Sequence, residues 1–216
     1  LDIDKIHSMV EYAVEDITGV SASQIEMNSG LQFYDGITTD EIQQILIKSA
    51  SDLISLENPN YTYVAARLLL YSLRKKLFGK LWDHPHFADQ VKSCVDAKVY
   101  DSEIFDNYER KDFDRMELWL KHDRDYDFTY AGLRQVIDKY LVQDRSTDQI
   151  FETPQFMYMM ISATLFAKYP KSTRMSYVKK YYDAISTFKI NIPTPVMAGV
   201  RTPMRQYASC VLVDVD

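Results

Sequence analysis

Apolar residues recur at helical spacing through the first third of the chain. Between residues 3 and 17 they stand three and four positions apart, so they share one face of a helix: Ile3, Ile6, Val10, Ala13, Val14 and Ile17. "SASQ" at 21–24 and "TTDE" at 38–41 place Gln or Glu three residues after a hydroxyl residue, the spacing of a capping box at a helix start. Pro59 interrupts the pattern. We therefore predict helices over 3–17, 21–34, 38–57 and 61–78.

The middle of the chain shows shorter periodic stretches. Gly79 and Pro85 break the pattern and predict a domain boundary near residue 80. Beyond it, helices are predicted over 87–98, 102–107, 112–122, 130–137, 154–168 and 172–187. Two β-prone runs, 140–143 and 149–151, flank a polar turn and predict a small hairpin.

The last thirty residues differ, because prolines punctuate segments that read as extended. Tyr207, Ser209, Val211 and Val213 alternate, which predicts a buried strand with Cys210 on its other face. The patterning as a whole predicts a mainly α fold.

Composition and charge exclude several functions. With 46% hydrophobic and 26% charged residues, the chain is typical of a globular protein. A net charge of -6 argues against the broad basic surface that nonspecific nucleic-acid binding needs. No apolar run is long enough to span a bilayer. Two cysteines, more than a hundred residues apart, fit a reducing compartment, so we expect a cytoplasmic protein without nucleic-acid or membrane partners.

The individual histidines and cysteines give weak signals on their own. His84 and His86 could share a metal ion, but Pro85 lies between them and no third ligand is near, so we assign no metal site. His122, among charged residues, reads as a solvated helix end, and Cys94 as a half-buried apolar residue. From composition alone, Cys210 is more often a core cysteine than a reactive one.

Three longer segments carry a specific resemblance. "QFYDGITTDEI", "YVAARLLLYSLRKK" and "YDAISTFKINIPTPVMAGVRTPMRQYASCVL" resemble the large (α) subunit of class I aerobic ribonucleotide reductases, and the likeness runs along essentially the whole chain. The chain is similar to enterobacterial and large-phage forms of that subunit.

The resemblance implies a fold in three parts. These are a four-helix ATP-cone regulatory domain at 1–80, a helical N-terminal domain with the small hairpin at 81–190, and the start of the family's ten-stranded α/β barrel at 191–216. A closed barrel of this kind takes about 250 residues, so only its first strand is expected here.

The resemblance also implies the chemistry of the C-terminal segment. It assigns Cys210 as one of two cysteines that reduce the ribose and become a disulfide, which thioredoxin or glutaredoxin then reduces. It assigns Thr194 and Ser209 to the diphosphate of a ribonucleoside diphosphate substrate. The radical comes from a metal-containing cofactor in a small partner subunit.

For the ATP cone, the resemblance places Lys5, Thr39 and Lys75 around an allosteric ATP or dATP. The family's "KRDG" hairpin before "INLDKIH" is not in this chain, and Gln43 and Ser72 stand where relatives sensitive to dATP carry histidines. We therefore expect nucleotide binding to be weakened or lost, and dATP inhibition with it.

The family's radical cysteine, second redox cysteine, and catalytic asparagine and glutamate would lie beyond Asp216. We therefore expect this part to be inactive alone and to act with the remainder of a large subunit, as a homodimer when complete. The alternative is a non-enzymatic, nucleotide-sensing ATP-cone module.

Overall fold

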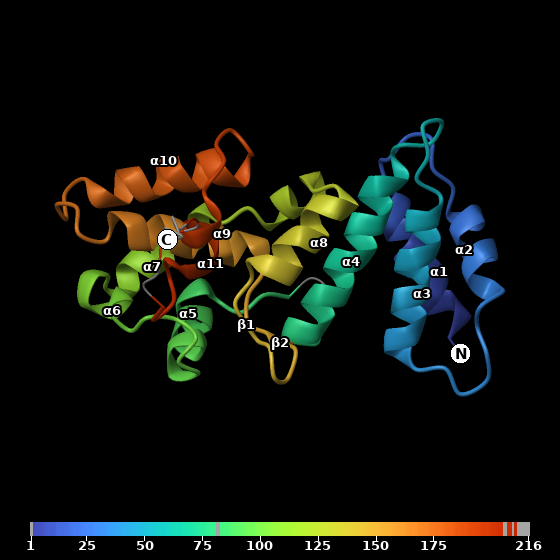
Figure 1. The fold of residues 1–216 in the computed structure, drawn as a ribbon, viewed down its shortest axis with the longest axis horizontal. Helices are drawn as coiled ribbons and strands as arrows, with labels where there is room; N and C mark the ends of the chain where they lie inside the picture. The colour runs from blue at the N-terminus through green and yellow to red at the C-terminus, as the bar shows by residue number, and fades with distance from the viewer. Residues whose placement is uncertain (1, 81–82, 205–206, 209, 211–216) are drawn as a thin grey trace, which may run out of the picture. The chain divides into compact units, whose positions relative to one another are not determined.

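The chain folds as a mainly helical protein with one small hairpin, as the sequence predicts (Figure 1). The computed structural model describes residues 2–80, 83–204, 207–208 and 210. Its helices are α1 Ile3–Val14, α2 Ala22–Gly30, α3 Thr39–Asp52, α4 Tyr61–Phe78, α5 Phe87–Asp96, α6 Ile104–Asn107, α7 Arg110–Trp119, the 3-10 helix η1 His122–Asp127, α8 Tyr130–Lys139, α9 Pro154–Phe166, α10 Arg174–Ser186 and α11 Thr194–Gly199. The strands are β1 Gln143–Asp144 and β2 Gln149–Ile150.

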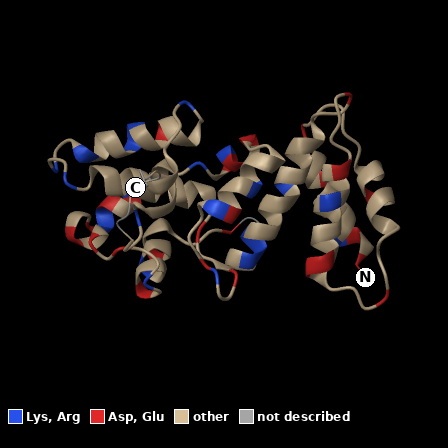
Figure 2. Cartoon of the chain, in the orientation of Figure 1, with Lys and Arg blue, Asp and Glu red and all other residues tan. Residues whose placement is uncertain are grey.

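Two compact units divide the chain. Unit 1 contains the described residues of 1–82 together with 125–135, and unit 2 contains 83–124 and those of 136–216. None of the helices in the described part of the chain is both long enough and apolar enough to cross a membrane. Lys and Arg are interspersed with Asp and Glu along each unit (Figure 2).

Unit 1 is built on α4, which packs against α1 and α3, while α2 packs against both of these helices. Val10, Leu46, Val64 and Leu68 are fully buried between them. The predicted capping boxes act at the helix starts: the Ser21 hydroxyl accepts from Gln24 N, and at α3 both arms of the box between Thr38 and Glu41 are formed. The box at Thr38 fixes the start of α3, which forms one wall of the first cavity described below.

Segment 125–135 joins unit 1 through buried charges and an aromatic ring. Arg74 of α4 lies 3.4 Å from Asp125, and both side chains are almost fully buried. The guanidinium groups of Arg67 and Arg74 lie 5.3 and 5.5 Å from the Tyr126 ring centroid, within reach of a cation–π interaction. Sequence spacing gives no sign of these contacts, since the partners are about fifty residues apart.

Unit 2 is built around α9. Every residue from Pro154 to Ala163 is buried, because this helix is apolar on all sides and can be stable only inside the core. Helix α10 packs along α9 and also contacts α7, and α5 packs on α7. The predicted cap and first-turn proline are present at the start of α9, where the Thr153 hydroxyl accepts from Phe156 N.

The hairpin is antiparallel and short, with Gln143 opposite Ile150 and Asp144 opposite Gln149. The Asp144 carboxylate accepts hydrogen bonds from the backbone and hydroxyl of Ser146, which closes the turn.

Several predicted helix ends are too late in the sequence. Helix α1 ends at Val14, because Asp16 adopts a left-handed φ of 59°. Helix α3 ends at Asp52, and the Ser55 hydroxyl then accepts from Asn58 N as the chain turns. Propensity is weak at such ends, and these local contacts decide the boundary.

The prediction of extended structure after residue 190 is wrong for residues 194–199, which form α11. Pro193 occupies the N-cap position and Pro195 lies in the first turn, where a missing N–H has no helical partner to lose. Of the predicted strand, Tyr207, Ala208 and Cys210 have no regular structure, and Cys210 is exposed rather than buried. Ser209, Val211 and Val213 lie outside the described residues, so the barrel strand stays a prediction.

Candidate functional site

A cavity of about 650 Å³ opens in unit 1 between the first turns of α1 and α3 and the last turn of α4. It brings together all three residues assigned to the regulatory nucleotide, Lys5, Thr39 and Lys75, and adds Lys80. Its apolar wall consists of Ile6, Met9, Tyr12 and Ile42. Three ammonium groups suit a phosphate, and the apolar wall suits a flat base.

Acidic groups share the mouth of this cavity. The Lys5 ammonium lies 3.1 Å from the Asp2 carboxylate, with both groups exposed. Hydrogen bonds from Lys5 hold the pKa of Asp2 below its usual value. Asp2 also caps α1 by accepting from Lys5 N. An incoming polyphosphate would therefore compete with Asp2 for Lys5, which weakens that contact.

Gln43 and Ser72, the positions at which the resemblance implies histidines in dATP-sensitive relatives, are both buried. The Gln43 amide donates to the Leu68 carbonyl at 2.9 Å and so joins α3 to α4. Gln43 also lines the cavity. Gln43 thus joins the two helices by an uncharged hydrogen bond and places no cation at the cavity wall.

A second cavity, of about 660 Å³, lies in unit 2 beside α11 and the hairpin. Thr194 lines it, together with Lys98, Lys139 and Arg145, and the described lining residues include no Asp or Glu. The Thr194 hydroxyl is 3.3 Å from the Tyr140 hydroxyl. Cations and hydroxyls without a carboxylate favour an anionic ligand. Cys210 is not among the residues that line this cavity. Ser209 lies outside the described residues.

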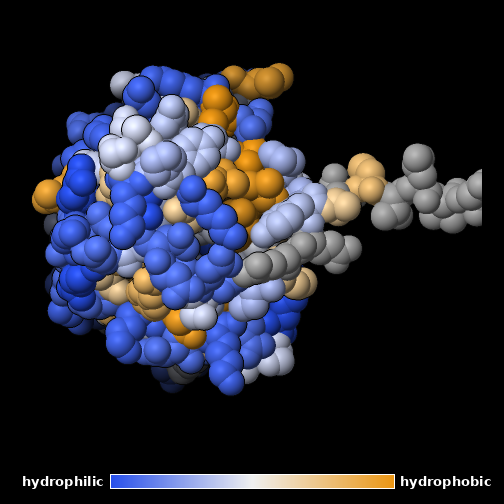
Figure 3. Space-filling model, turned by 90° about the vertical axis from the view of Figure 1, so that its left-hand side faces the viewer, coloured by the Kyte–Doolittle hydropathy of each residue, from blue (hydrophilic) through white to orange (hydrophobic). Residues whose placement is uncertain are grey.

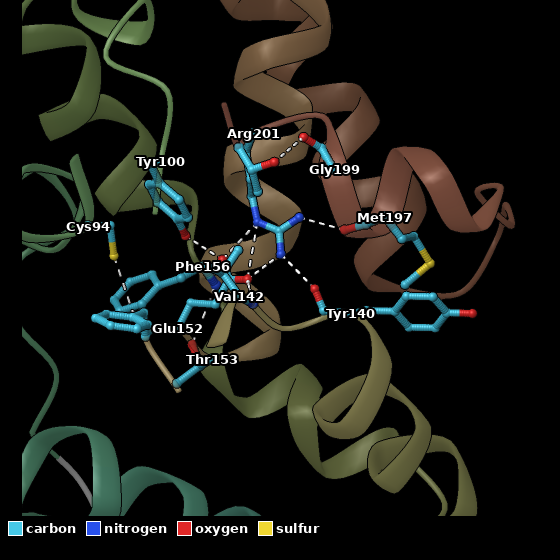
Figure 4. Close-up of polar contacts among 12 residues, drawn as sticks. Cys94, Tyr100, Tyr140, Val142, Glu152, Thr153, Phe156, Met197, Gly199 and Arg201 are labelled. Carbon is cyan, nitrogen blue, oxygen red and sulfur yellow. Dashed lines mark hydrogen bonds and ion pairs between the residues drawn. The ribbon is translucent and has the colours of Figure 1, made fainter. Parts of the chain in front are cut away.

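Arg201, which lies in the "RTPMRQYASCVL" segment, is a fully buried cation next to this cavity (Figure 4). Its Nε donates to both carboxylate oxygens of Glu152, at 3.1 and 2.9 Å, and its Nη2 donates to Glu152 as well. Nη1 donates to the Met197 carbonyl in α11 at 2.5 Å, and Nη2 donates to the Tyr140 carbonyl at 2.8 Å. One guanidinium thus fastens α11 to the chain that enters the hairpin.

Glu152 receives further donors from two other segments. The backbone N–H of Val142 donates to its Oε1 at 2.7 Å, and the Tyr100 hydroxyl donates to its Oε2. Burial and the Glu152 charge raise the pKa of Tyr100 well above its usual value, so this hydroxyl stays protonated. Burial opposes the charge of Arg201, but the adjacent Glu152 outweighs it and raises the pKa of Arg201. The Glu152 carboxylate thus accepts from Arg201, Val142 and Tyr100 together.

Sequence reasoning missed Arg201, Glu152 and Tyr140 as parts of one cluster. A signal was present: Arg201 is a lone charge in the stretch "VMAGVRTPM", and a buried arginine needs an anionic partner. The identity of that partner, 49 residues earlier, was not readable from the pattern.

The isolated histidines have a structural role. The rings of His84 and His122 stack at 4.0 Å, and His122 meets Phe156 edge-on at 5.2 Å. The interpretation of His122 as a solvated helix end is therefore wrong: α7 ends at Trp119, and His122 begins η1, half-buried on an aromatic ring. Within the described ranges, no group of three or more His, Cys, Asp or Glu residues is placed to hold a metal ion.

The third cavity, of about 440 Å³, also lies in unit 2 and has a mixed lining: apolar residues, including Ile104, Leu165, Val196 and Val200, alternate with the charged residues Asp101, Glu103, Lys168 and Arg201. In the view of Figure 3, the largest group of hydrophobic residues lies right of the centre of a mostly hydrophilic face, and smaller groups lie elsewhere on it. Glu103 at the rim of the cavity pairs with Lys168 at 3.1 Å.

Comparison with known families gives two matches. Residues 1–76 match the ATP cone domain, and residues 126–205 match the all-alpha domain of ribonucleotide reductase. The first match contains Lys5, Thr39 and Lys75, and the second contains Glu152, Thr194 and Arg201.

Among curated proteins, the ribonucleoside-diphosphate reductase subunit alpha of Haemophilus influenzae is 50% identical over 216 residues, all of this chain and 28% of that protein. The ribonucleoside-diphosphate reductase 1 subunit alpha of Escherichia coli is 47% identical over 214 residues, covering 99% of this chain and 28% of that protein. The subunit alpha of enterobacteria phage T4 is 43% identical over 215 residues, with the same coverages. The chain thus spans 28% of the length of these relatives.

Proposed function

Because this chain belongs to the ribonucleotide reductase large-subunit family, as an N-terminal region with an ATP cone and an all-alpha domain, we propose that it works within an enzyme that reduces ribonucleoside diphosphates to deoxyribonucleoside diphosphates. The observation that carries the proposal is the 50% identity along the entire chain, which includes the segment ending in Cys210. The alternative function, a stand-alone nucleotide-sensing module, does not explain why the chain contains that segment.

In the proposed reaction the ribose 2'-hydroxyl leaves as water and hydrogen takes its place. The two electrons come from two thiols, which become a disulfide, and Cys210 supplies one of them. Cys94 is not suited to be the other, because it is 1% exposed and lies among Gln90, Phe151 and the Glu152 charge. The second thiol would come from the remainder of the subunit, and a thioredoxin- or glutaredoxin-type dithiol would reduce the disulfide. A small partner subunit would supply the radical.

The residues of this chain would hold the substrate's diphosphate. We assign the Thr194 and Ser209 hydroxyls to this role, with Thr194 in a cavity whose described charged groups are all cationic. The cations Lys98, Lys139 and Arg145 would raise the local concentration of an anionic substrate.

The test is an activity assay on the complete subunit. Mixed with its small subunit and a dithiol reductant, it should convert cytidine diphosphate to deoxycytidine diphosphate, with product measured by chromatography. Absence of product, in a mixture where a related enzyme pair works, would contradict the proposal.

We also propose that the cavity of unit 1 binds an adenine nucleotide as a regulatory effector. Support comes from the ATP cone match over residues 1–76 and from the meeting of Lys5, Thr39 and Lys75 at one cavity. Calorimetry with ATP and dATP should show binding to the chain, weakened as the resemblance implies. Lys75→Ala should weaken it about tenfold, the worth of one charged hydrogen bond.

The matched control is Lys76→Ala. Lys76 neighbours Lys75 but lies outside the cavity lining and faces Asp40 at 3.7 Å. Equal losses in both variants would indicate nonspecific attraction of the nucleotide to α4, and no binding by the unmodified chain would contradict the effector role.

A further inference from the structure

The short helix α11 carries Thr194, and its position depends on contacts from outside the helix. It has six residues and no side-chain cap at its start. A helix this short is not stable by itself in water, so tertiary contacts must hold it. One of these is the hydrogen bond that the buried Arg201 guanidinium donates to the Met197 carbonyl at 2.5 Å.

The same guanidinium holds the residue that faces Thr194. Its Nη2 donates to the Tyr140 carbonyl at 2.8 Å, and the Tyr140 hydroxyl lies 3.3 Å from the Thr194 hydroxyl. Arg201 therefore binds the backbone of Tyr140 and, through Met197, the backbone of α11, the helix that carries Thr194. In Figure 4, Met197 of α11 and Tyr140 both lie to the right of the Arg201 fork and are joined to it by dashed lines.

Glu152 fixes the guanidinium in turn. Its carboxylate accepts from Arg201, from Val142 N at 2.7 Å and from the Tyr100 hydroxyl. The backbone of Arg201 is held as well, because its carbonyl accepts from Asp101 N at 2.9 Å. These hydrogen bonds hold the Arg201 and Glu152 side chains in one conformation.

We propose that Arg201 and Glu152 are positioning residues: their buried ion pair sets the place of the Thr194 hydroxyl, partly through Tyr140, for the substrate's diphosphate. This inference rests on the proposed function, because it takes Thr194 as a substrate contact. It goes beyond it by naming the residues that hold that contact and by adding Tyr140 to the site.

Arginine is needed at this place for its shape. All three guanidinium nitrogens donate, in directions that reach two carbonyls and a carboxylate together. A lysine at 201 would keep the charge but would present its donors from a single atom and could not span these acceptors. Buried ion pairs often add little stability over an apolar pair of similar size, so a positional role explains the pair better than a stabilising one.

The experiment measures kcat and KM for cytidine diphosphate with the complete subunit and its small subunit, together with the melting temperature of each variant. Arg201→Met should lower the melting temperature, because it leaves Glu152 buried without its cation. The double variant Arg201→Met with Glu152→Leu removes both charges and should regain much of that stability. Its KM should nevertheless stay raised by about 10- to 100-fold, the usual cost of a misplaced contact.

Arg174→Met is the matched control. Arg174 is also a buried arginine of unit 2, 3.5 Å from Asp112, and it stacks 4.4 Å from the Tyr108 ring centroid, among residues that do not line the Thr194 cavity. Its loss should lower the melting temperature and leave KM unchanged. Arg201→Lys should also raise KM above that of the unmodified enzyme, because a lysine cannot reach all of these acceptors.

A double variant with restored stability and an unaltered KM would overturn the inference while leaving the proposed function in place. If the double variant does not fold, Tyr140→Phe decides, because it keeps the carbonyl that Arg201 binds. It should raise KM about three- to tenfold, and an unaltered KM would overturn the role of the network. An unmodified enzyme that forms no product would overturn the proposed function, and the inference would fall with it.

Discussion

The two cysteines have opposite surroundings. Cys94 is 1% exposed, and burial, followed by the Glu152 charge, raises its pKa to about 12. Its thiolate is therefore scarce at neutral pH, and the thiolate is the nucleophilic form. Cys210 is exposed. Environment, rather than residue type, separates a packing thiol from an accessible one.

We expect iodoacetamide at pH 8 to label the folded chain at Cys210 and to leave Cys94 unmodified. In denaturant both should react, because burial no longer protects Cys94. Peptide mass spectrometry of the two samples measures this, and labelling of Cys94 in the folded chain at the rate of Cys210 would contradict the burial described here.

Among single residues, those that belong to a recognisable motif were predicted from the sequence. Those whose role depends on a distant partner in the fold were missed. Lys5, Thr39 and Lys75 were assigned through the family resemblance, and the fold brings them to one cavity. The roles themselves stay proposals. Arg201 and Glu152 were missed because a buried pair depends on which segments pack together, and periodicity along the chain carries no such information.

At the scale of elements, the start of α3 determines one wall of the unit 1 cavity. Thr38 caps the helix by accepting from Glu41 N at 3.2 Å, and Glu41 returns a bond by accepting from Thr38 N at 2.9 Å. Thr39, the next residue, lines the cavity. The cap therefore places a cavity residue as well as stabilising a helix.

Thr38→Ala should lower the free energy of unfolding by about 1 kcal/mol, the usual value of such a cap. Urea unfolding followed by circular dichroism measures it. Thr173→Ala is the control, since Thr173 stands at the N-cap of α10 but its side chain makes no capping hydrogen bond to the described backbone. A loss as large in the control as in Thr38→Ala would argue against the capping box.

The contact of α1 with α2 includes an ion pair that depends on pH. The His7 ring lies 2.7 Å from Glu26, and that hydrogen bond, followed by the charge of Glu26, raises the pKa of His7 above its usual 6.5. A raised pKa in the folded state means that the contribution to stability is fully present below about pH 6.5 and is lost as pH rises through the raised value.

In an NMR titration, Glu26→Gln should return the pKa of His7 toward 6.5. Glu11→Gln should change it less, because Glu11 acts only through its charge and ranks after Glu26. A pKa of His7 that does not respond to Glu26→Gln would contradict the ion pair.

Element prediction succeeded where local signals agreed. The fourth helix was predicted over 61–78, the range the structure has, because Pro59 bounds its start and Gly79 adopts a left-handed φ of 71° at its end. The hairpin was predicted from its polar turn. The 3-10 segment η1 and helix α11 were missed, since the first is stabilised by packing of distant rings and the second by the buried arginine.

At the scale of the whole molecule, the mainly α fold and the family were readable from patterning together with long, ordered motifs. The matches to an ATP cone and to an all-alpha domain confirm that resemblance. The domain boundaries at residues 80 and 190 and the barrel strand stay predictions. Most of the predicted strand falls outside the described residues.

The proposed function depends above all on the redox role of Cys210, which a comparison of two variants can test. The measurement compares Cys210→Ser with Cys94→Ala in the complete subunit, assayed with its small subunit and thioredoxin for deoxycytidine diphosphate formed over many turnovers. We predict that Cys210→Ser abolishes multiple turnover and that Cys94→Ala retains it. Normal multiple turnover by the Cys210→Ser variant would contradict the assignment of this chain's thiol to the reduction.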